Sequence, residues 1–213
     1  MVIGMIGNGT MASALAEAWA REGHRVLMSG RSTERVQAAA QRLGERVESA
    51  SVPAAVERAD VIVIAVAWEG IDEVLALAGA SGGALAGKTI IDCTNAVDYA
   101  SGKLKPERGS AAEHIAEHAP GAHVVKALHL FAGTGWLDPS PAQPVRTVAI
   151  CGDHPAALDE ASALLRDLGG SPAVIGGLDH ARQLEDVAGF VMQLVAAGSN
   201  PVTAVPHVEP VGV

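Results

Sequence analysis

The sequence predicts an α/β fold built on a doubly wound, mainly parallel sheet, and three observations carry this prediction. Short β-branched runs alternate with Ala-rich amphipathic stretches along almost the whole chain, as in strands that covering helices connect. The run from Val61 to Ala65 is continuously apolar, which is typical of a central strand covered on both faces. Apolar residues make up 49% of the 213 residues, enough for the core of one ordinary domain with a small appendage.

The expected elements follow from local patterns. The first helix has apolar residues at helical spacing and stops before Gly23, a C-terminal cap signal. Residues 79–87 and 95–109 lack periodicity and are expected to be loops, the second long enough to be functional. The expected strands are residues 2–6, 25–29, 46–48, 61–65, 89–92, 123–126, 147–151 and 173–175. The expected helices are residues 10–22, 33–43, 52–58, 68–78, 110–119, 155–168 and 179–197.

Composition excludes several classes of function. The formal net charge is −9, so there is no surplus of Lys and Arg to hold nucleic-acid phosphates. The two cysteines, Cys93 and Cys151, lie in separate apolar runs, which argues against a disulfide framework and a thiolate metal cluster. The N-terminus lacks the basic segment of a signal peptide, and the longest apolar run, residues 61–68, is too short to cross a bilayer. We therefore expect a soluble cytoplasmic protein with neither nucleic acid nor membrane as a partner.

The turn after the first strand predicts a dinucleotide site. Strand 2–6 runs directly into a G-x-G-x-x-A motif that opens a helix, the context in which this motif identifies a Rossmann-type fold. Gly7 permits the tight turn, Gly9 lets the backbone approach a pyrophosphate, and Ala12 keeps the helix close to the strand. The N–H groups at the start of the helix then stabilise the phosphates. The motif is formed by Gly7, Asn8, Gly9, Thr10, Met11 and Ala12.

The end of the second strand indicates which dinucleotide binds. An NAD site usually has an Asp or Glu there, and this chain has none before Glu34 in the next helix. Arg31 offers a fork of donors suited to a 2′-phosphate, with Ser29 and Ser32 beside it. We therefore predict NADP, although a surface Arg beside a Ser that caps the next helix is the alternative.

A break in composition suggests where the dinucleotide-binding part ends. Residues 130–144 are rich in Gly and Pro and are expected to be loop. We predict an NADP-binding Rossmann domain over residues 1–144 and a small extension over residues 145–213 that packs on it. The extension would contain a strand-helix-strand unit, a last helix and an extended tail from Pro201.

The chain resembles the NADPH-dependent reductases of the deazaflavin coenzyme F420. The resemblance covers nearly the whole chain, and its pattern between residues 61 and 126 is more specific than the glycine motif. It is carried by residues 5–12, 29–32, 64–68, 91–95, 110–113, 120–127 and 151–154.

The resemblance implies roles for residues at the carboxyl ends of the predicted strands. It assigns the pyrophosphate to Gly9, Thr10 and Met11, and the 2′-phosphate to Ser29, Arg31 and Ser32. Ligands of open α/β sheets bind at these strand ends, which agrees with the assignment. The residues implied at the nicotinamide end are Ala65, Val66, Ala67, Trp68, Thr94 and Asn95.

The chain departs from the family pattern where the second substrate would stack. Leu128 and His129 follow Ala127 where the family commonly has Phe-Asn, and Ala96 follows Asn95 where Pro is usual. Flavin and quinone therefore stay open beside coenzyme F420 as hydride acceptors. Hydride transfer needs two rings held face to face and little acid–base chemistry, so no catalytic residue is predicted. His129 is the candidate substrate-binding residue, and Trp136 is either packing or a lid.

Two other functions compete with this one. The glycine motif also resembles pyrroline-carboxylate reductases and β-hydroxyacid dehydrogenases, which reduce imines or carbonyls, but their large helical substrate domain does not fit into residues 145–213. A non-catalytic NADPH-binding module is the other alternative, because hydride transfer leaves no acid–base signature in a sequence.

Three further expectations concern metal, subunits and charge. His114 and His118 match an H-x-x-E-H zinc pattern, but with no third ligand nearby we predict no metal site. The last helix is apolar over more than one face, which predicts a homodimer that buries it. The cations available for the negatively charged tail of a deazaflavin are Lys103, Lys105 and Arg108 in loop 95–109.

Overall fold

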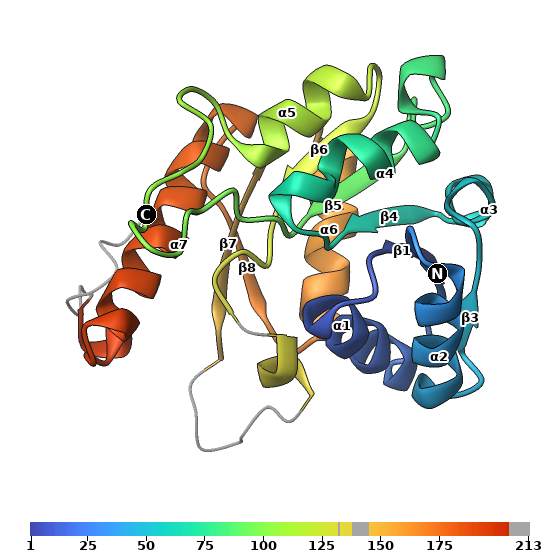
Figure 1. Cartoon of the computed structure of the whole chain (residues 1–213), viewed down its shortest axis with the longest axis horizontal. Coiled ribbons are helices and arrows are strands. Elements are labelled where there is room, and N and C mark those ends of the chain that lie inside the picture. The colour runs from blue at the N-terminus through green and yellow to red at the C-terminus, as the bar shows by residue number, and fades with distance from the viewer. Residues whose placement is uncertain (132, 138–144, 205–213) are drawn as a thin grey trace.

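In the computed structural model, eight strands form one continuous sheet in the order β3-β2-β1-β4-β5-β6-β7-β8 (Figure 1). The structure describes residues 1–131, 133–137 and 145–204. All neighbouring strands are parallel except β6 and β7, which are antiparallel. The strands are β1 (Val2–Ile6), β2 (Arg25–Ser29), β3 (Val47–Ser49), β4 (Val61–Ile64), β5 (Thr89–Asp92), β6 (His123–Lys126), β7 (Thr147–Gly152) and β8 (Ser171–Val174).

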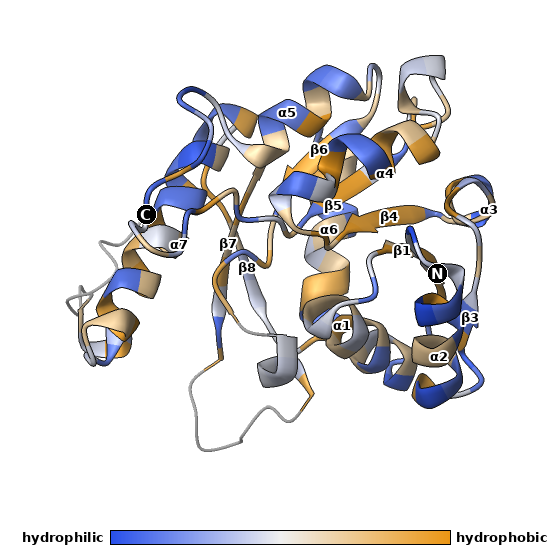
Figure 2. Cartoon of the chain, viewed as in Figure 1, coloured by the Kyte–Doolittle hydropathy of each residue, from blue (hydrophilic) through white to orange (hydrophobic). Residues whose placement is uncertain are grey.

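Helices cover both faces of the sheet. The apolar side chains form two buried clusters, one with α1, α2 and α6 and the other with α3, α4, α5 and α7. Figure 2 shows apolar colouring along β4 and β5 and polar colouring on parts of the helices around them. The helices are α1 (Thr10–Arg21), α2 (Thr33–Leu43), α3 (Val52–Arg58), α4 (Ile71–Leu77), α5 (Ala111–His118), α6 (Pro155–Asp167) and α7 (Ala181–Ala196).

Strand alternation explains the apolar run predicted to be central. Val61 and Val63 of β4 belong to one buried cluster, and Ile62 and Ile64 belong to the other. Both faces of β4 are therefore covered, as the sequence predicted. No helix among residues 1–131, 133–137 and 145–204 has the length and apolar character needed to cross a bilayer.

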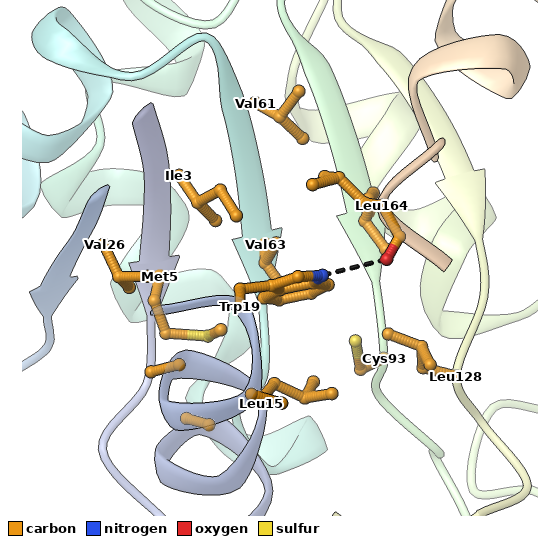
Figure 3. Close-up of a cluster of buried hydrophobic side chains, with 14 of the residues drawn as sticks. Ile3, Met5, Leu15, Trp19, Val26, Val61, Val63, Cys93, Leu128 and Leu164 are labelled. Carbon is orange, nitrogen blue, oxygen red and sulfur yellow. Dashed lines mark hydrogen bonds between the residues drawn. The ribbon is translucent and has the colours of Figure 1, made fainter. Parts of the chain in front are cut away.

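One buried hydrogen bond joins α1 to α6 within the cluster that contains α1, α2 and α6. Trp19 of α1 is fully buried and donates its indole N–H to the carbonyl oxygen of Leu164 in α6 at 2.9 Å (Figure 3). The large indole fills space among small side chains without leaving its donor unpaired. This contact fixes α1, which follows the glycine motif, against the C-terminal part of the chain.

Local signals set the helix boundaries. Ser32, Ser51 and Ser110 cap α2, α3 and α5 by accepting backbone N–H bonds from the first turn. Gly23 follows α1 with φ +89°, and Gly44 follows α2 with φ +96°, a conformation that glycine adopts without strain. These positions agree with the predicted starts and ends of the helices.

Several predicted boundaries were wrong. The helix expected over 68–78 is a 3-10 turn at Trp68–Gly70 followed by α4, and the helix expected over 179–197 likewise begins as a 3-10 turn at Leu178–His180. The tail expected to be extended from Pro201 starts with a 3-10 turn at Pro201–Thr203, because the Asn200 side chain caps it and Pro suits its first position. Another turn, Gly133–Trp136, lies inside the predicted loop 130–144, of which residues 132 and 138–144 are outside the described part.

The residues after 144 continue the sheet of the N-terminal part. β7 pairs with β6 through Val125 with Gly152 and Lys126 with Cys151, and β8 then pairs with β7. The strand-helix-strand extension predicted from the sequence is present as β7, α6 and β8. The division into two domains at residue 144 stays a prediction.

Candidate functional site

The glycine turn after β1 exposes the start of α1. Gly7 has φ +143°, and a Cβ there would overlap the carbonyl oxygen of Ala65 at the end of β4. Its N–H donates to Ser29 O at 2.8 Å, so the turn is fixed to the ends of two neighbouring strands. Gly9, the residue before α1, provides no side-chain cap, and a Cβ there would meet no atom within 4 Å. The open space in front of free helix N–H groups suits a pyrophosphate, as the motif predicts.

The end of β2 carries one exposed cation. The Arg31 side chain is 58% exposed, and its Nη1 lies 2.8 Å from Glu73 Oε2 of α4. Ser32 caps α2 by accepting the Arg35 N–H at 3.4 Å. Ser29 is fully buried and donates its hydroxyl to Met5 O at 3.1 Å, so this hydroxyl is used inside the sheet. Arg31 is therefore the exposed cation beside Ser32 at this strand end, and the Ser29 hydroxyl is already paired inside the sheet; their contacts with a 2′-phosphate stay a prediction.

A cavity of about 560 Å³ adjoins the glycine turn. One side is formed by the turn and the ends of β4 and β5, and the other by α7, the segment around residues 97–99, residues 128–131 and Gly133. Cys93 and Leu128, which line it, belong to the core cluster drawn in Figure 3. The lining residues are Gly9, Thr10, Met11, Ala65, Val66, Ala67, Cys93, Thr94, Asn95, Val97, Tyr99, Leu128, His129, Leu130, Phe131, Gly133, Ala188, Val191 and Met192.

The cavity brings together most of the residues predicted at the nicotinamide end. Ala65, Val66 and Ala67 line it from the end of β4, together with Thr94, Asn95 and His129. Trp68 is absent from its lining and instead packs edge-on against His114 of α5, with ring centroids 5.1 Å apart. A 3-10 turn begins at Trp68, in place of the continuous helix expected over 68–78.

Two polar atoms in the cavity lining are buried without a protein partner among the described residues. Asn95 donates its Nδ2 to the carbonyl oxygen of His129 at 2.6 Å, which leaves Asn95 Oδ1 unpaired. His129 Nδ1 is also unpaired. Burial, with a smaller contribution from the charge on Lys126, lowers the pKa of His129 to about 3. His129 is therefore neutral at physiological pH, and the two atoms can hydrogen-bond to an uncharged ligand.

A buried ionic cluster contacts the backbone of Thr94. Lys126 Nζ at the end of β6 is 2.8 Å from Asp92 Oδ2 of β5 and 2.9 Å from Glu185 Oε1 of α7, and all three side chains are 0% exposed. Burial alone would lower the pKa of Lys126, but the two carboxylates raise it. Residue patterns alone predict no role for these three side chains. The signal available was a Lys and an Asp at the ends of two apolar strands.

The loop that bounds the cavity is held against α7. Arg182 of α7 donates to the carbonyl oxygen of Gly109 at 2.7 Å, and a Cβ at Gly189 would overlap the carbonyl oxygen of Gly102. Of the three cations predicted to meet an acceptor tail, Lys105 pairs with Glu69. Lys103 and Arg108 are exposed on the same loop.

Trp136 packs in the interior. It is 3% exposed, lies edge-on to Phe131 with centroids 5.6 Å apart, and has the Arg146 guanidinium 5.0 Å from its ring centroid. These contacts support the packing alternative and not a lid.

The paired histidines of α5 contact other groups. His114 Nε2 lies 2.6 Å from Asp72 Oδ1, and His118 Nδ1 bonds to His114 O at 2.9 Å. Over the described residues, no group of three or more His, Cys, Asp or Glu side chains is arranged to hold a metal ion.

Comparisons with known proteins agree on the family. A family model described as NADP oxidoreductase, coenzyme F420-dependent, matches residues 2–96. The F420-dependent NADP reductase of Methanothermobacter marburgensis is 30% identical over 204 residues, which cover 88% of this chain and 89% of that protein. Metalloreductase STEAP3 of Rattus norvegicus is also 30% identical, over 87% of this chain, but the chain spans only 36% of that protein.

Solved structures agree as well. A protein from Arthrobacter sp. FB24, assigned provisionally as an F420 dependent NADP-reductase, superposes with a TM-score of 0.81 at 27% identity, covering 92% of this chain and 95% of that one. An imine reductase from Myxococcus stipitatus superposes with a TM-score of 0.66 at 22% identity and covers 93% of this chain and 63% of that one, a likeness of fold alone. The glycine turn, the cavity beside it and these relatives together place the chain in the family of F420-dependent NADP reductases, which are NADP-dependent oxidoreductases.

Proposed function

We propose that the protein binds NADP(H) along the carboxyl ends of its strands and exchanges a hydride between the nicotinamide and the deazaflavin coenzyme F420. The observation that carries the proposal is the continuity of the cavity with the N-terminus of α1. The cavity begins at Gly9, Thr10 and Met11 and ends against Val191 and Met192 of α7. A dinucleotide held at the glycine turn would leave the α7 side of the cavity for a second ring.

The nucleotide would be held by charge at one end and by shape at the other. Arg31 offers an exposed guanidinium to the 2′-phosphate, and the N–H groups of α1 face the pyrophosphate. Ala65, Val66 and Ala67 are small, so they leave room for the nicotinamide ring against the sheet. When bound, the nucleotide supplies the hydride, and the chain orients it and keeps water away.

The chemistry of the acceptor side fits a planar ring with an amide edge. Val97, Leu130 and Phe131 give that side an apolar surface on which a flat ring can lie. Asn95 Oδ1 can accept a hydrogen bond from an N–H group, and the neutral His129 can serve a neighbouring polar atom. Deazaflavins and flavins present an N–H beside a carbonyl, whereas quinones lack the N–H. This feature favours F420 or a flavin over a quinone.

The same histidine argues against imine or carbonyl reduction. Those reactions need a proton delivered to the substrate nitrogen or oxygen as hydride arrives. With a pKa of about 3, His129 carries almost no protonated form at neutral pH. The imine reductases that superpose on this chain are 20–22% identical to it, so they support the fold and not this chemistry.

An acceptor screen tests the proposal. NADPH oxidation is followed with F420, FMN, a quinone and a cyclic imine in separate reactions. F420 should give a kcat/KM about a hundredfold or more above the imine. Turnover of the imine alone would support the competing reductase class, and NADPH binding without turnover of any acceptor would support a non-catalytic module.

A variant of Asn95 tests the acceptor site within the same screen. Asn95→Leu removes the unpaired oxygen and should raise the KM for F420 and for FMN about tenfold, the effect of one lost hydrogen bond, while the quinone KM changes little. Asn200→Ala, a change of the same residue type outside the cavity lining, is the matched control. Equal effects on all acceptors would remove Asn95 from ring recognition.

We also propose that exposed cations of loop 95–109 contact the negatively charged tail of F420. Lys103 and Arg108 are exposed there, and Lys105 can exchange its pairing with Glu69 for the tail. Replacing all three with Ala should raise the KM for F420 and leave NADPH binding unchanged. A KM equal to that of the wild type would place the tail elsewhere.

Finally, we propose that the active form is a cytoplasmic homodimer that buries α7. Val187, Phe190 and Val195 expose 39%, 51% and 53% of their surface on this helix, an unusual amount for large apolar residues. The reducing cytoplasm would suit the two cysteines, which are both free.

A further inference from the structure

The buried cluster of Asp92, Lys126 and Glu185 is unusual in its composition. Two carboxylates and one ammonium are 0% exposed where the neighbouring strand carries Ile64 in register with Asp92. Removing charges from water is costly, and apolar residues of similar volume often replace a buried ionic cluster without loss of stability. An apolar side chain is therefore compatible with this position in the sheet, as Ile64 shows. Stability alone therefore gives little reason for the cluster.

The cluster fixes the backbone of Thr94 from both sides. Asp92 Oδ1 accepts the Thr94 N–H at 2.8 Å, and Lys126 Nζ donates to the Thr94 carbonyl oxygen. The Thr94 hydroxyl also donates to Val66 O at 3.2 Å, which joins the ends of β4 and β5. The next residue, Asn95, has its unpaired oxygen in the cavity lining. The cluster thus fixes the segment that would contact both rings, the nicotinamide beside Thr94 and the acceptor through the Asn95 oxygen.

The same cluster also fixes α7, which forms the cavity wall opposite the Thr94–Asn95 segment. Glu185 accepts the Ala111 N–H with both carboxylate oxygens, at 2.9 and 3.1 Å, and so holds α7 against the N-terminus of α5. Ala188 and Met192, which line the cavity, are three and seven residues further along α7 and share a helix face with Glu185. One hydrogen-bonded network therefore joins the two walls between which the reacting rings would lie.

We infer that Asp92, Lys126 and Glu185 are positioning residues that set the spacing between the Thr94–Asn95 segment and α7, and so hold the nicotinamide in its reactive place. The inference rests on the proposed function, because it assumes that the nicotinamide occupies this side of the cavity. Hydride transfer depends steeply on the distance and angle of the reacting rings. A rigid ionic network that contacts no substrate is suited to fixing that geometry.

The test compares two ligands that differ only in the nicotinamide. NADPH and 2′-phospho-ADP-ribose share the phosphates and the adenosine, so the ratio of their dissociation constants isolates the contribution of the nicotinamide pocket. The wild type should bind NADPH about tenfold or more tightly than the fragment. Glu185→Gln and Asp92→Asn should each reduce that ratio toward one and leave the fragment affinity within about twofold of the wild type. Glu113→Gln is the matched control. Glu113 also lies at the N-terminal end of α5, but it bonds to Ser110 and not to the cluster.

A charge-free triple variant keeps the test independent of folding. Each single carboxylate variant leaves one ammonium and one carboxylate in the interior, and these remaining buried charges can prevent folding. The combination of Asp92→Asn, Lys126→Met and Glu185→Gln leaves none. It should fold with a melting temperature near that of the wild type and still lose the preference for NADPH over the fragment. A folded triple variant that keeps this preference would overturn the inference, and so would one that fails to fold while both single variants keep it.

A single-turnover measurement gives a second readout. The rate constant for hydride transfer from NADPH to F420 at saturating concentrations does not depend on the fraction of protein that is folded. This rate constant should fall about tenfold or more in the single variants. A merely structural role would lower only the amplitude of the absorbance change, which follows the amount of folded protein. A wild type that fails to bind NADPH more tightly than the fragment, or fails to turn over F420, would contradict the proposed function instead.

Discussion

Arg31 and Glu73 form an ion pair across the site predicted for the 2′-phosphate, with 2.8 Å between Nη1 and Oε2. Arg31 follows β2, and Glu73 lies in the first turn of α4. Both side chains are more than half exposed, so water screens the pair and it contributes little to stability, at most about 1 kcal/mol. A phosphate dianion can therefore compete with Glu73 for the guanidinium.

Replacing Arg31 should remove the preference for NADPH. Arg31→Ala should weaken NADPH binding about tenfold or more through loss of a charge-assisted contact, and NADH binding should change little. Arg31→Glu should go further, because it places like charges together. Titration of both nucleotides against the three proteins measures the effect. Equal losses for NADPH and NADH would show that Arg31 supports the adenine or the fold and not the phosphate.

Replacing Glu73 should have the opposite effect. Glu73→Gln frees Arg31 from its partner and should tighten NADPH binding by up to about fivefold, the equivalent of an exposed ion pair. NADH should bind as before. Asp72→Asn is the matched control, since the neighbouring carboxylate contacts His114 and not Arg31. Weaker NADPH binding in Glu73→Gln would mean that the pair holds Arg31 in its binding orientation.

His129 should make stability depend on pH. Its pKa is about 3 when folded and about 6.5 when unfolded, so the unfolded chain binds the proton more readily. The stabilisation from the neutral ring is fully present above about pH 6.5 and is lost as pH falls toward 3, at up to about 1.4 kcal/mol per pH unit. Urea unfolding at pH 7 and pH 5 should show this loss in the wild type and a smaller loss in His129→Leu. An identical loss in both proteins would assign the pH dependence to other groups.

The two glycines of the motif should respond differently to alanine. Gly7→Ala should unfold the turn or lower the melting temperature strongly, because φ is +143° and the new Cβ would overlap Ala65 O. Gly9→Ala should fold like the wild type, since its Cβ meets nothing within 4 Å, but should weaken nucleotide binding where the pyrophosphate approaches. Thermal unfolding and NADPH titration separate the two effects. Wild-type affinity in Gly9→Ala would place the pyrophosphate away from this turn.

A charge on α7 should break the proposed dimer. Phe190 is 51% exposed on this helix, and Phe190→Glu would place a carboxylate in the interface. Sedimentation should show a dimer for the wild type and a monomer for the variant. Tyr99→Glu, which changes an exposed aromatic residue of the neighbouring loop, is a useful comparison. A monomeric wild type at micromolar concentration would rule out the dimer.

Local sequence signals predicted the elements that local interactions form. The bounds of β1, β2, α2, α3, β5 and β6 agree with the sequence analysis because caps, glycines and strand alternation define them. The glycine turn was predicted for the same reason, since its geometry depends on consecutive residues.

Other features depend on contacts between distant segments. Glu73 meets Arg31 only because the first turn of α4 lies near the residues that follow β2, and Glu185 meets Lys126 only because α7 packs against β7, the strand beside β6. The buried position of the Ser29 hydroxyl follows from the packing of β2 beside β1. Neither residue spacing nor composition predicts such contacts between distant segments.

The state of the two thiols offers a way to observe this protein inside a mixture. Burial raises the pKa of Cys93 far above its usual range and raises that of Cys151 to about 12, so the native chain holds no reactive thiolate. An alkylating reagent should therefore modify the protein only in molecules that have opened. The rate of labelling in a crude extract would then report the opening equilibrium, and its slowing on addition of a nucleotide would report occupancy without any purified enzyme or activity assay.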